Sequence, residues 1–108
     1  MIDVRFQRDA SGDITSFTMK GHAESGPYGY DLVCAGASAV SFGTVNAVYE
    51  LTGTALDVEM EDGGMLAASL PDDIRPEHVQ KIQTLLEGLR VSMQTMEEQY
   101  GQFIQVTS

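Results

Sequence analysis

The segment IDVRFQRDASGDITSFTMK, residues 2–20, carries the pattern from which the fold class follows. Apolar and polar residues alternate over 2–7, which is the period of a half-buried strand. Small and acidic residues gather at 9–13, as in a turn, and β-branched and aromatic residues resume at 14–20. We therefore expect a β-hairpin here.

A second hairpin is expected over residues 56–70. Leu56, Val58 and Met60 alternate with acidic residues, and a turn signal, Asp-Gly-Gly, follows at 62–64. The acidic face of this hairpin must point to solvent, because unpaired carboxylates are costly to bury.

Two helices complete the pattern. Residues 34–51 are small or apolar and carry no charge before Glu50, which predicts a helix buried on most sides. Apolar residues over 79–100 recur at intervals of three and four, as in an amphipathic helix, and Gly101 is expected to end it. A last strand is expected at 103–106.

The predicted order is therefore β-β-α-β-β-α-β. Hairpins without parallel crossovers imply antiparallel strands packed with two helices, which is the α+β class. A chain of 108 residues is long enough for one ordinary core, so we expect a single domain over residues 1–108.

The net charge of the chain indicates which classes of partner it can bind. Six Lys and Arg against sixteen Asp and Glu give a net charge of -10. A phosphate backbone is repelled by such a surface, so we expect no direct nucleic-acid binding. A basic partner is attracted, although the same charge also serves solubility.

Other classes are disfavoured by what the sequence lacks. We expect no membrane segment, because no apolar run approaches about 20 residues, and no signal peptide precedes the first strand. The expected location is cytoplasmic. One Cys and two His cannot form a structural zinc site without carboxylates, so neither a metal nor another cofactor is expected.

Cys34 is the single cysteine, so no internal disulfide can form. It is either a small buried hydrophobe or a reactive thiol. A nucleophilic cysteine must ionise, and a helix N-terminus or a neighbouring imidazolium favours the thiolate. Cys34 lies at the predicted start of a helix, where the helix N-terminus is expected to favour the thiolate.

Two histidines are candidates for the imidazolium beside Cys34. His22 ends the second predicted strand, and the loop that follows permits contact with Cys34 without requiring it. The alternative for His22 is an ordinary loop histidine. His78 lies beside Glu77 in the first turn of the second predicted helix, and we interpret it as an exposed surface residue.

The stretch GHAESGPYGYDLVCAGAS, residues 21–38, resembles the signature of the ribosomal-processing cysteine proteases, the Prp family. The matching positions are Gly21-His22-Ala23, Gly29, Asp31, Val33-Cys34-Ala35 and Ser38. The resemblance extends over essentially the whole chain. It implies a Cys-His dyad in which Cys34 is the nucleophile and His22 acts as general base and then acid, through an acyl-enzyme.

Two further motif residues have open roles. Asp31 either orients His22 or caps the start of the helix. Ser38 lies one turn after Cys34 on the same helical face, where it either hydrogen-bonds the thiolate or substrate or is a small residue needed for packing. Backbone N–H groups at the start of this helix are the expected oxyanion hole.

The loop between the strand and the helix has the composition of a lid. Gly26 and Gly29 flank Pro27 and Tyr28, and Gly21 stands at the beginning of the loop, so substrate binding is expected to assemble the dyad. The candidates for lining an apolar substrate groove, each of which is alternatively ordinary packing, are Tyr28, Tyr30, Phe42 and Met60.

The resemblance also implies a substrate and an assembly state. The substrate is the short N-terminal extension of a large-subunit ribosomal protein, cut after an aromatic residue, and the basic precursor matches the acidic chain. A homodimer is expected. Two alternatives stay open: another Cys-His thiol hydrolase, such as an amidase or acyl hydrolase, and a non-catalytic acidic adaptor that binds ribosomal protein.

Overall fold

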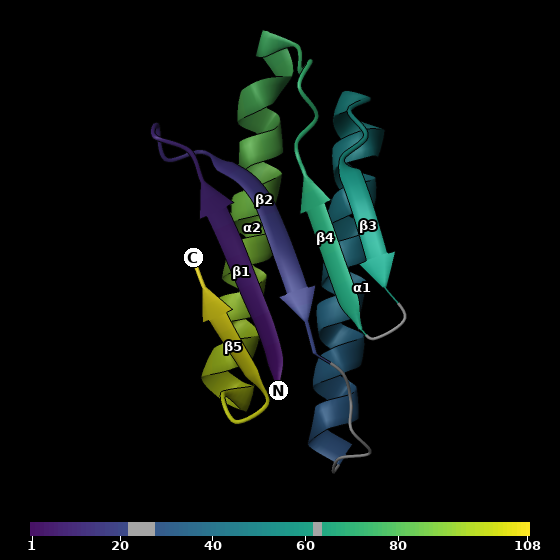
Figure 1. The fold of residues 1–108 in the computed structure, drawn as a ribbon, viewed down its shortest axis with the longest axis vertical. Helices are drawn as coiled ribbons and strands as arrows, with labels where there is room; N and C mark the ends of the chain where they lie inside the picture. Colours follow the sequence, from purple (N-terminus) through teal and green to yellow (C-terminus); the bar gives the residue numbers. More distant parts are fainter. Residues whose placement is uncertain (22–27, 62–63) are drawn as a thin grey trace.

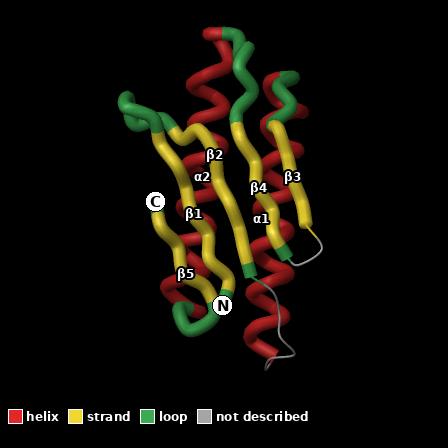
Figure 2. The backbone as a smooth tube through the Cα atoms, viewed as in Figure 1, coloured by secondary structure: helices red, strands yellow, loops and turns green. Residues whose placement is uncertain are grey.

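Five strands form one sheet, and two helices cover one of its faces (Figures 1 and 2). In this computed structural model the described residues are 1–21, 28–61 and 64–108, and for 28–31 only the backbone is described. The described elements are β1 (Ile2–Arg8), β2 (Ile14–Lys20), α1 (Tyr28–Thr52), β3 (Asp57–Glu61), β4 (Met65–Ser69), α2 (Pro76–Tyr100) and β5 (Ile104–Thr107). The predicted element order and the α+β class are confirmed.

The strand order is β3-β4-β2-β1-β5. The hairpins β1–β2 and β3–β4 and the pair β2–β4 are antiparallel, as predicted. The pair β1–β5 is parallel, so the expectation of antiparallel pairing throughout is wrong for this edge. The reason is topological. After β4, α2 returns the chain to the opposite end of the sheet, so β5 runs in the direction of β4, which is also that of β1 (Figure 1).

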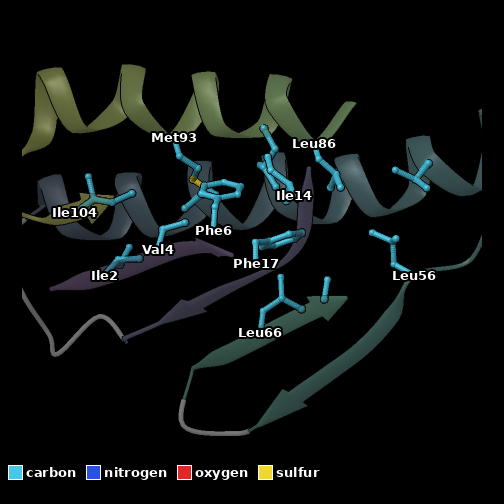
Figure 3. Packing of buried hydrophobic residues seen from close by; sticks show 14 of the residues in the cluster. Ile2, Val4, Phe6, Ile14, Phe17, Leu56, Leu66, Leu86, Met93 and Ile104 are labelled. Carbon is cyan, nitrogen blue, oxygen red and sulfur yellow. The ribbon is translucent and has the colours of Figure 1, made fainter. Parts of the chain in front are cut away.

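The hydrophobic core lies between the helices and the facing side of the sheet (Figure 3). Strand alternation supplies one half of it, with Val4 and Phe17 almost completely buried. The rings of Phe6 and Phe17 pack with their centroids 6.0 Å apart. Helix α2 supplies the other half through an apolar stripe: Ile82, Leu86, Leu89 and Met93. Gly101 follows the last residue of α2, as predicted.

Helix α1 differs from its prediction in two respects. It begins at Tyr28 rather than near Cys34, so Gly29 belongs to its first turn. Glycine weakens a helix without forbidding it, so Gly29 did not mark a loop at this position. The prediction that this helix is buried on most sides is also wrong. Its fully buried side chains form one stripe, which contains Val33, Ala37, Ser41 and Val48.

The outer side of α1 is exposed because both helices lie on the same face of the sheet (Figure 2). Residues 32–52 are long and apolar enough to cross a membrane by length and composition alone, contrary to the sequence expectation. This is weak evidence, because a helix that packs in the core of a soluble protein passes the same test. In this structure α1 packs closely against α2, where a side chain at Gly36 would meet the sulfur of Met96.

Polar contacts fix α2 to the first hairpin. The Gln83 side chain donates to the carbonyl oxygen of Ile14 and accepts from its N–H, both at 2.8 Å. At the end of β1, Arg8 Nη1 lies 2.7 Å from a Glu87 carboxylate oxygen, and Arg90 Nε lies 2.6 Å from the other. Hydrogen bonds from Arg8 and then Arg90 lower the pKa of Glu87 to about 2.

We expect Glu87 to make stability depend on pH. The pKa of its carboxyl is lower in the folded chain than the ordinary value of 4.5. Its contribution to the free energy of unfolding is therefore fully present above pH 4.5. The contribution is lost as pH falls towards about 2. Since the side chain is 37% exposed, solvent screens its ion pairs, and we expect it to contribute about 1 kcal/mol to the free energy of unfolding.

Urea unfolding of Glu87→Gln at several pH values tests this expectation. The variant is expected to be less stable than wild type near neutral pH and to approach wild type in acid. Glu98→Gln, on an exposed acid of the same helix, is the matched control. An equal loss of stability at every pH would contradict the assignment.

Candidate active site

A narrow groove of about 130 Å³ opens beside Cys34. Three parts of the chain build it: the end of β2, one side of α1 and the β3–β4 hairpin. The lining residues are Met19, Gly21, Cys34, Ser38, Phe42, Met60, Glu61, Gly64, Met65 and Leu66. The groove is therefore mostly apolar and holds the one thiol of the chain.

The rotation of α1 about its axis places Cys34 in this groove. Val33 and Ala37 belong to the buried stripe, and Cys34 and Ser38 follow them directly in the sequence. A step of one residue turns about 100° around a helix, so both side chains move from the core to its margin. Cys34 is accordingly half-buried, at the edge of the core, and faces open space. Cys34 is thus only partly buried, although it packs against the core, and whether its thiol is reactive stays a prediction.

Ser38 lies in the same groove, which confirms that it shares a helical face with Cys34. Its role remains a prediction. Phe42, one turn further along α1, lines the groove as expected, and Met60 lines it from β3. Two of the four aromatic and methionine candidates for an apolar groove are therefore confirmed as lining residues.

The helix N-terminus is not at Cys34. Because α1 begins at Tyr28, its unpaired N–H groups belong to residues 28–31, and Cys34 lies in the second turn. The favourable field of a helix end falls off within the first turn, so position alone does not activate this thiol. An oxyanion hole at the start of this helix stays a prediction.

Gly21 links the groove to the histidine that follows it in the sequence. It has φ of +118°, which only glycine adopts readily, and its N–H donates to the carbonyl oxygen of Gly64 at 3.1 Å. A Cβ at this position would collide with the carbonyl oxygen of Met1. Gly21 thus holds the end of β2 between β1 and β4, and His22 is the next residue along the chain.

His78 lies at the other end of the molecule. It lines a separate, more polar cavity of about 530 Å³ with Thr52 and Arg75. From Cys34 to Thr52, α1 rises about 27 Å. His78 is half-buried rather than exposed as expected, because it faces this cavity, and it cannot reach the thiol.

Several predicted site features fall outside the described residues. These are His22 and Gly26, and the side chains of Tyr28, Tyr30 and Asp31. The distance from His22 to Cys34, the role of Asp31 and the lid therefore stay predictions.

Apart from Met60, sequence reasoning missed the contribution of the β3–β4 hairpin to the groove. Glu61, Met65 and Leu66 lie beside Cys34, although no motif connects them to it. Their contact depends on α1 passing beneath β3 and β4, which no local sequence pattern records (Figure 1).

The family model for cysteine protease Prp matches residues 1–105. The chain belongs to the Prp family. A ribosomal processing cysteine protease Prp from Bacillus subtilis is 44% identical over 110 residues, which cover 100% of this chain and 97% of that protein. Family membership makes the chain a cysteine protease of the ribosomal-processing class.

Solved Prp structures share the fold. One is a Staphylococcus aureus Prp in complex with a substrate peptide, with a TM-score of 0.87 and 39% identity, covering 99% of this chain and 98% of that one. Another is the S. aureus Prp with a covalently linked product peptide, with a TM-score of 0.83 and 41% identity over the same shares of the two chains. The agreement extends over the strands and helices described above.

We expect Gly21→Ala to impair catalysis more than folding. The alanine must shift the end of β2 because its Cβ meets backbone atoms of Met1 and Ile2. Because His22 is the predicted general base, a displacement of about 1 Å there is expected to lower kcat/KM by roughly a hundredfold. Steady-state cleavage and urea unfolding measure the two effects separately.

Gly12→Ala is the matched control. Gly12 also has positive φ, +94°, but a Cβ there meets nothing within 4 Å, and Gly12 lies in the turn after β1. We expect about 1 kcal/mol of destabilisation and normal activity. Equal activity losses in the two variants would contradict a specific role for Gly21.

Proposed function

We propose that this chain is a Cys34–His22 endopeptidase that removes the short N-terminal extension of a large-subunit ribosomal protein. The observation that carries the proposal is the half-buried thiol of Cys34 in an apolar groove whose wall includes Gly21, the residue before His22. The relatives named as ribosomal-processing proteases support the substrate class.

The chemistry follows from the two side chains. His22 takes the proton of the Cys34 thiol, and the sulfur attacks the scissile carbonyl carbon. The C–N bond then breaks, the leaving amine takes the proton from His22, and a thioester remains on Cys34. Water attacks the thioester with His22 as base, which releases the acid product and restores the thiol. The S. aureus relative with a covalently linked product peptide supports a covalent route.

The histidine assignment is supported by the fold. The sequence contains two histidines, and His78 lines a cavity with Thr52, which lies about 27 Å along α1 from Cys34. His22 follows a residue that lines the same groove as the thiol. Its place in the sequence, directly after Gly21, therefore favours His22 over His78 as the partner of Cys34.

The substrate assignment is supported by charge and by the groove. A net charge of -10 attracts a basic ribosomal protein, and apolar Phe42 and Met60 offer contact to an aromatic residue at the cleavage site. Family membership favours this endopeptidase over an amidase, an acyl hydrolase or a non-catalytic adaptor.

Location and assembly stay predictions. We place the protein in the cytoplasm with its ribosomal substrate. For the expected homodimer we propose the exposed apolar residues of α1, among them Tyr49 and Leu51, which are more than half exposed.

Cys34→Ala is expected to abolish cleavage while substrate binding stays nearly intact. The substitution removes the nucleophile and little volume from the groove. Mass spectrometry of a full-length ribosomal protein precursor measures the cleavage, and fluorescence anisotropy measures binding. A variant that still cuts would overturn the nucleophile assignment, and a wild-type chain that leaves the precursor intact would overturn the substrate.

Alkylation of Cys34 by iodoacetamide across pH tests the dyad. We expect His22→Ala to move the pH profile of labelling to higher pH, because the imidazole that receives the thiol proton is lost. His78→Ala is the matched control and is expected to leave the profile unchanged. Identical profiles in wild type and His22→Ala would contradict the pair, and a thiol inert at every pH would favour the adaptor.

A further inference from the structure

Strand β3 is an open edge of the sheet. It pairs with β4 on one side, and the sheet ends with β3 on the other (Figure 2). All five residues of β3 are exposed. An edge strand presents alternate N–H and C=O groups that another extended chain can bind. The backbone of β3 is therefore available for strand addition.

The two faces of β3 differ chemically. On the outer face of the sheet, Asp57 and Glu59 line a hollow of about 210 Å³ whose floor includes the small residues opposite them, Ser69 and Ala67. On the helix side, Val58 and Met60 are 39% and 63% exposed. Apolar side chains this accessible on an edge strand are free to pack against another chain.

The same strand leads directly to the thiol. Met60 and Glu61, at the end of β3, line the groove that holds Cys34 and Phe42. An extended chain bound along β3 is therefore brought beside this groove at the end of the strand.

We propose that β3 is a substrate-binding edge on which an extended, basic segment of the substrate adds as a further strand beside Cys34. Alternate substrate side chains then lie on opposite faces. The basic ones meet Asp57 and Glu59, and the apolar ones meet Val58 and Met60. This inference rests on the proposed function and names the surface that selects the substrate.

Charge selects a basic segment over a second copy of this chain. If two β3 strands paired antiparallel about Glu59, that residue would face its own copy and Asp57 would face Glu61. Like charges directly opposite each other destabilise a strand pair, whereas opposite charges stabilise it. The row of acids therefore disfavours self-association at this edge and favours Lys or Arg.

The first experiment changes the charge of β3. The probe is a synthetic peptide that spans the extension and the first basic residues of the ribosomal protein. The double variant Asp57→Asn/Glu59→Gln is expected to lower kcat/KM roughly threefold to tenfold at low salt, mainly by raising KM. The matched control is Asp72→Asn/Glu98→Gln, which removes two exposed acids elsewhere and is expected to behave as wild type.

A companion peptide separates local pairing from general attraction. When its Lys and Arg residues are replaced by Glu, wild type is expected to cleave it poorly, and the β3 double variant is expected to discriminate less between the two peptides. Equal losses in the β3 variant and the matched control would show that net charge alone acts, and would overturn the proposal.

The second experiment tests the backbone contacts. Single N-methyl groups are placed at successive residues of the peptide, each of which removes one N–H donor. We expect kcat/KM to fall by roughly tenfold at every second residue and to change little between them. A uniform or aperiodic response would overturn strand addition.

The outcomes also separate this inference from the proposed function. If wild type cleaves the peptide through Cys34 but neither the charge series nor the N-methyl series shows the expected pattern, β3 is not the binding edge and the protease assignment stands. If wild type fails to cleave the peptide and its full-length precursor, the proposed function fails first.

Discussion

The burial of one apolar face of the sheet against α1 and α2 is the constraint on which the site depends. The stripe that contains Val33 and Ala37 must face the sheet, because these side chains are fully covered there. This fixes the rotation of α1, and with it the direction of Cys34, which follows Val33. A rotation of the helix by one residue position would bury the thiol in the core or turn it to solvent. The position of the nucleophile is thus a consequence of core packing.

The groove unites parts of the chain that perform different tasks. Helix α1 carries the nucleophile, and the end of β2 carries Gly21, whose φ of +118° and close approach to Met1 set the direction in which the chain continues to His22. The β3–β4 hairpin closes the remaining side with Met60 and Leu66. A rigid sheet and helix thereby supply the walls, while the edge strand β3 leaves one side open to an extended chain.

How well the sequence predicted a feature depended on how far apart in the chain the residues that form it lie. The patterns over residues 2–7 and 14–20 predicted the first hairpin correctly, because the alternation of a strand is visible among neighbouring residues of the sequence. Composition was a poorer guide for α1: Gly29 was assigned to a loop but lies in the helix, and an uncharged sequence was interpreted as burial although its outer side is exposed. The parallel pair β1–β5 was missed because it joins the two ends of the chain.

The sequence by itself determined the order of strands and helices and the Prp signature around His22 and Cys34, because periodicity and motif spacing are short-range properties of the chain. Only the tertiary structure decided that Cys34 is half-exposed in a groove, that His78 is remote from it, and that β3 is an open edge beside it. These features arise where α1 and the second hairpin pack together, and the core that joins them is formed by residues distant in sequence.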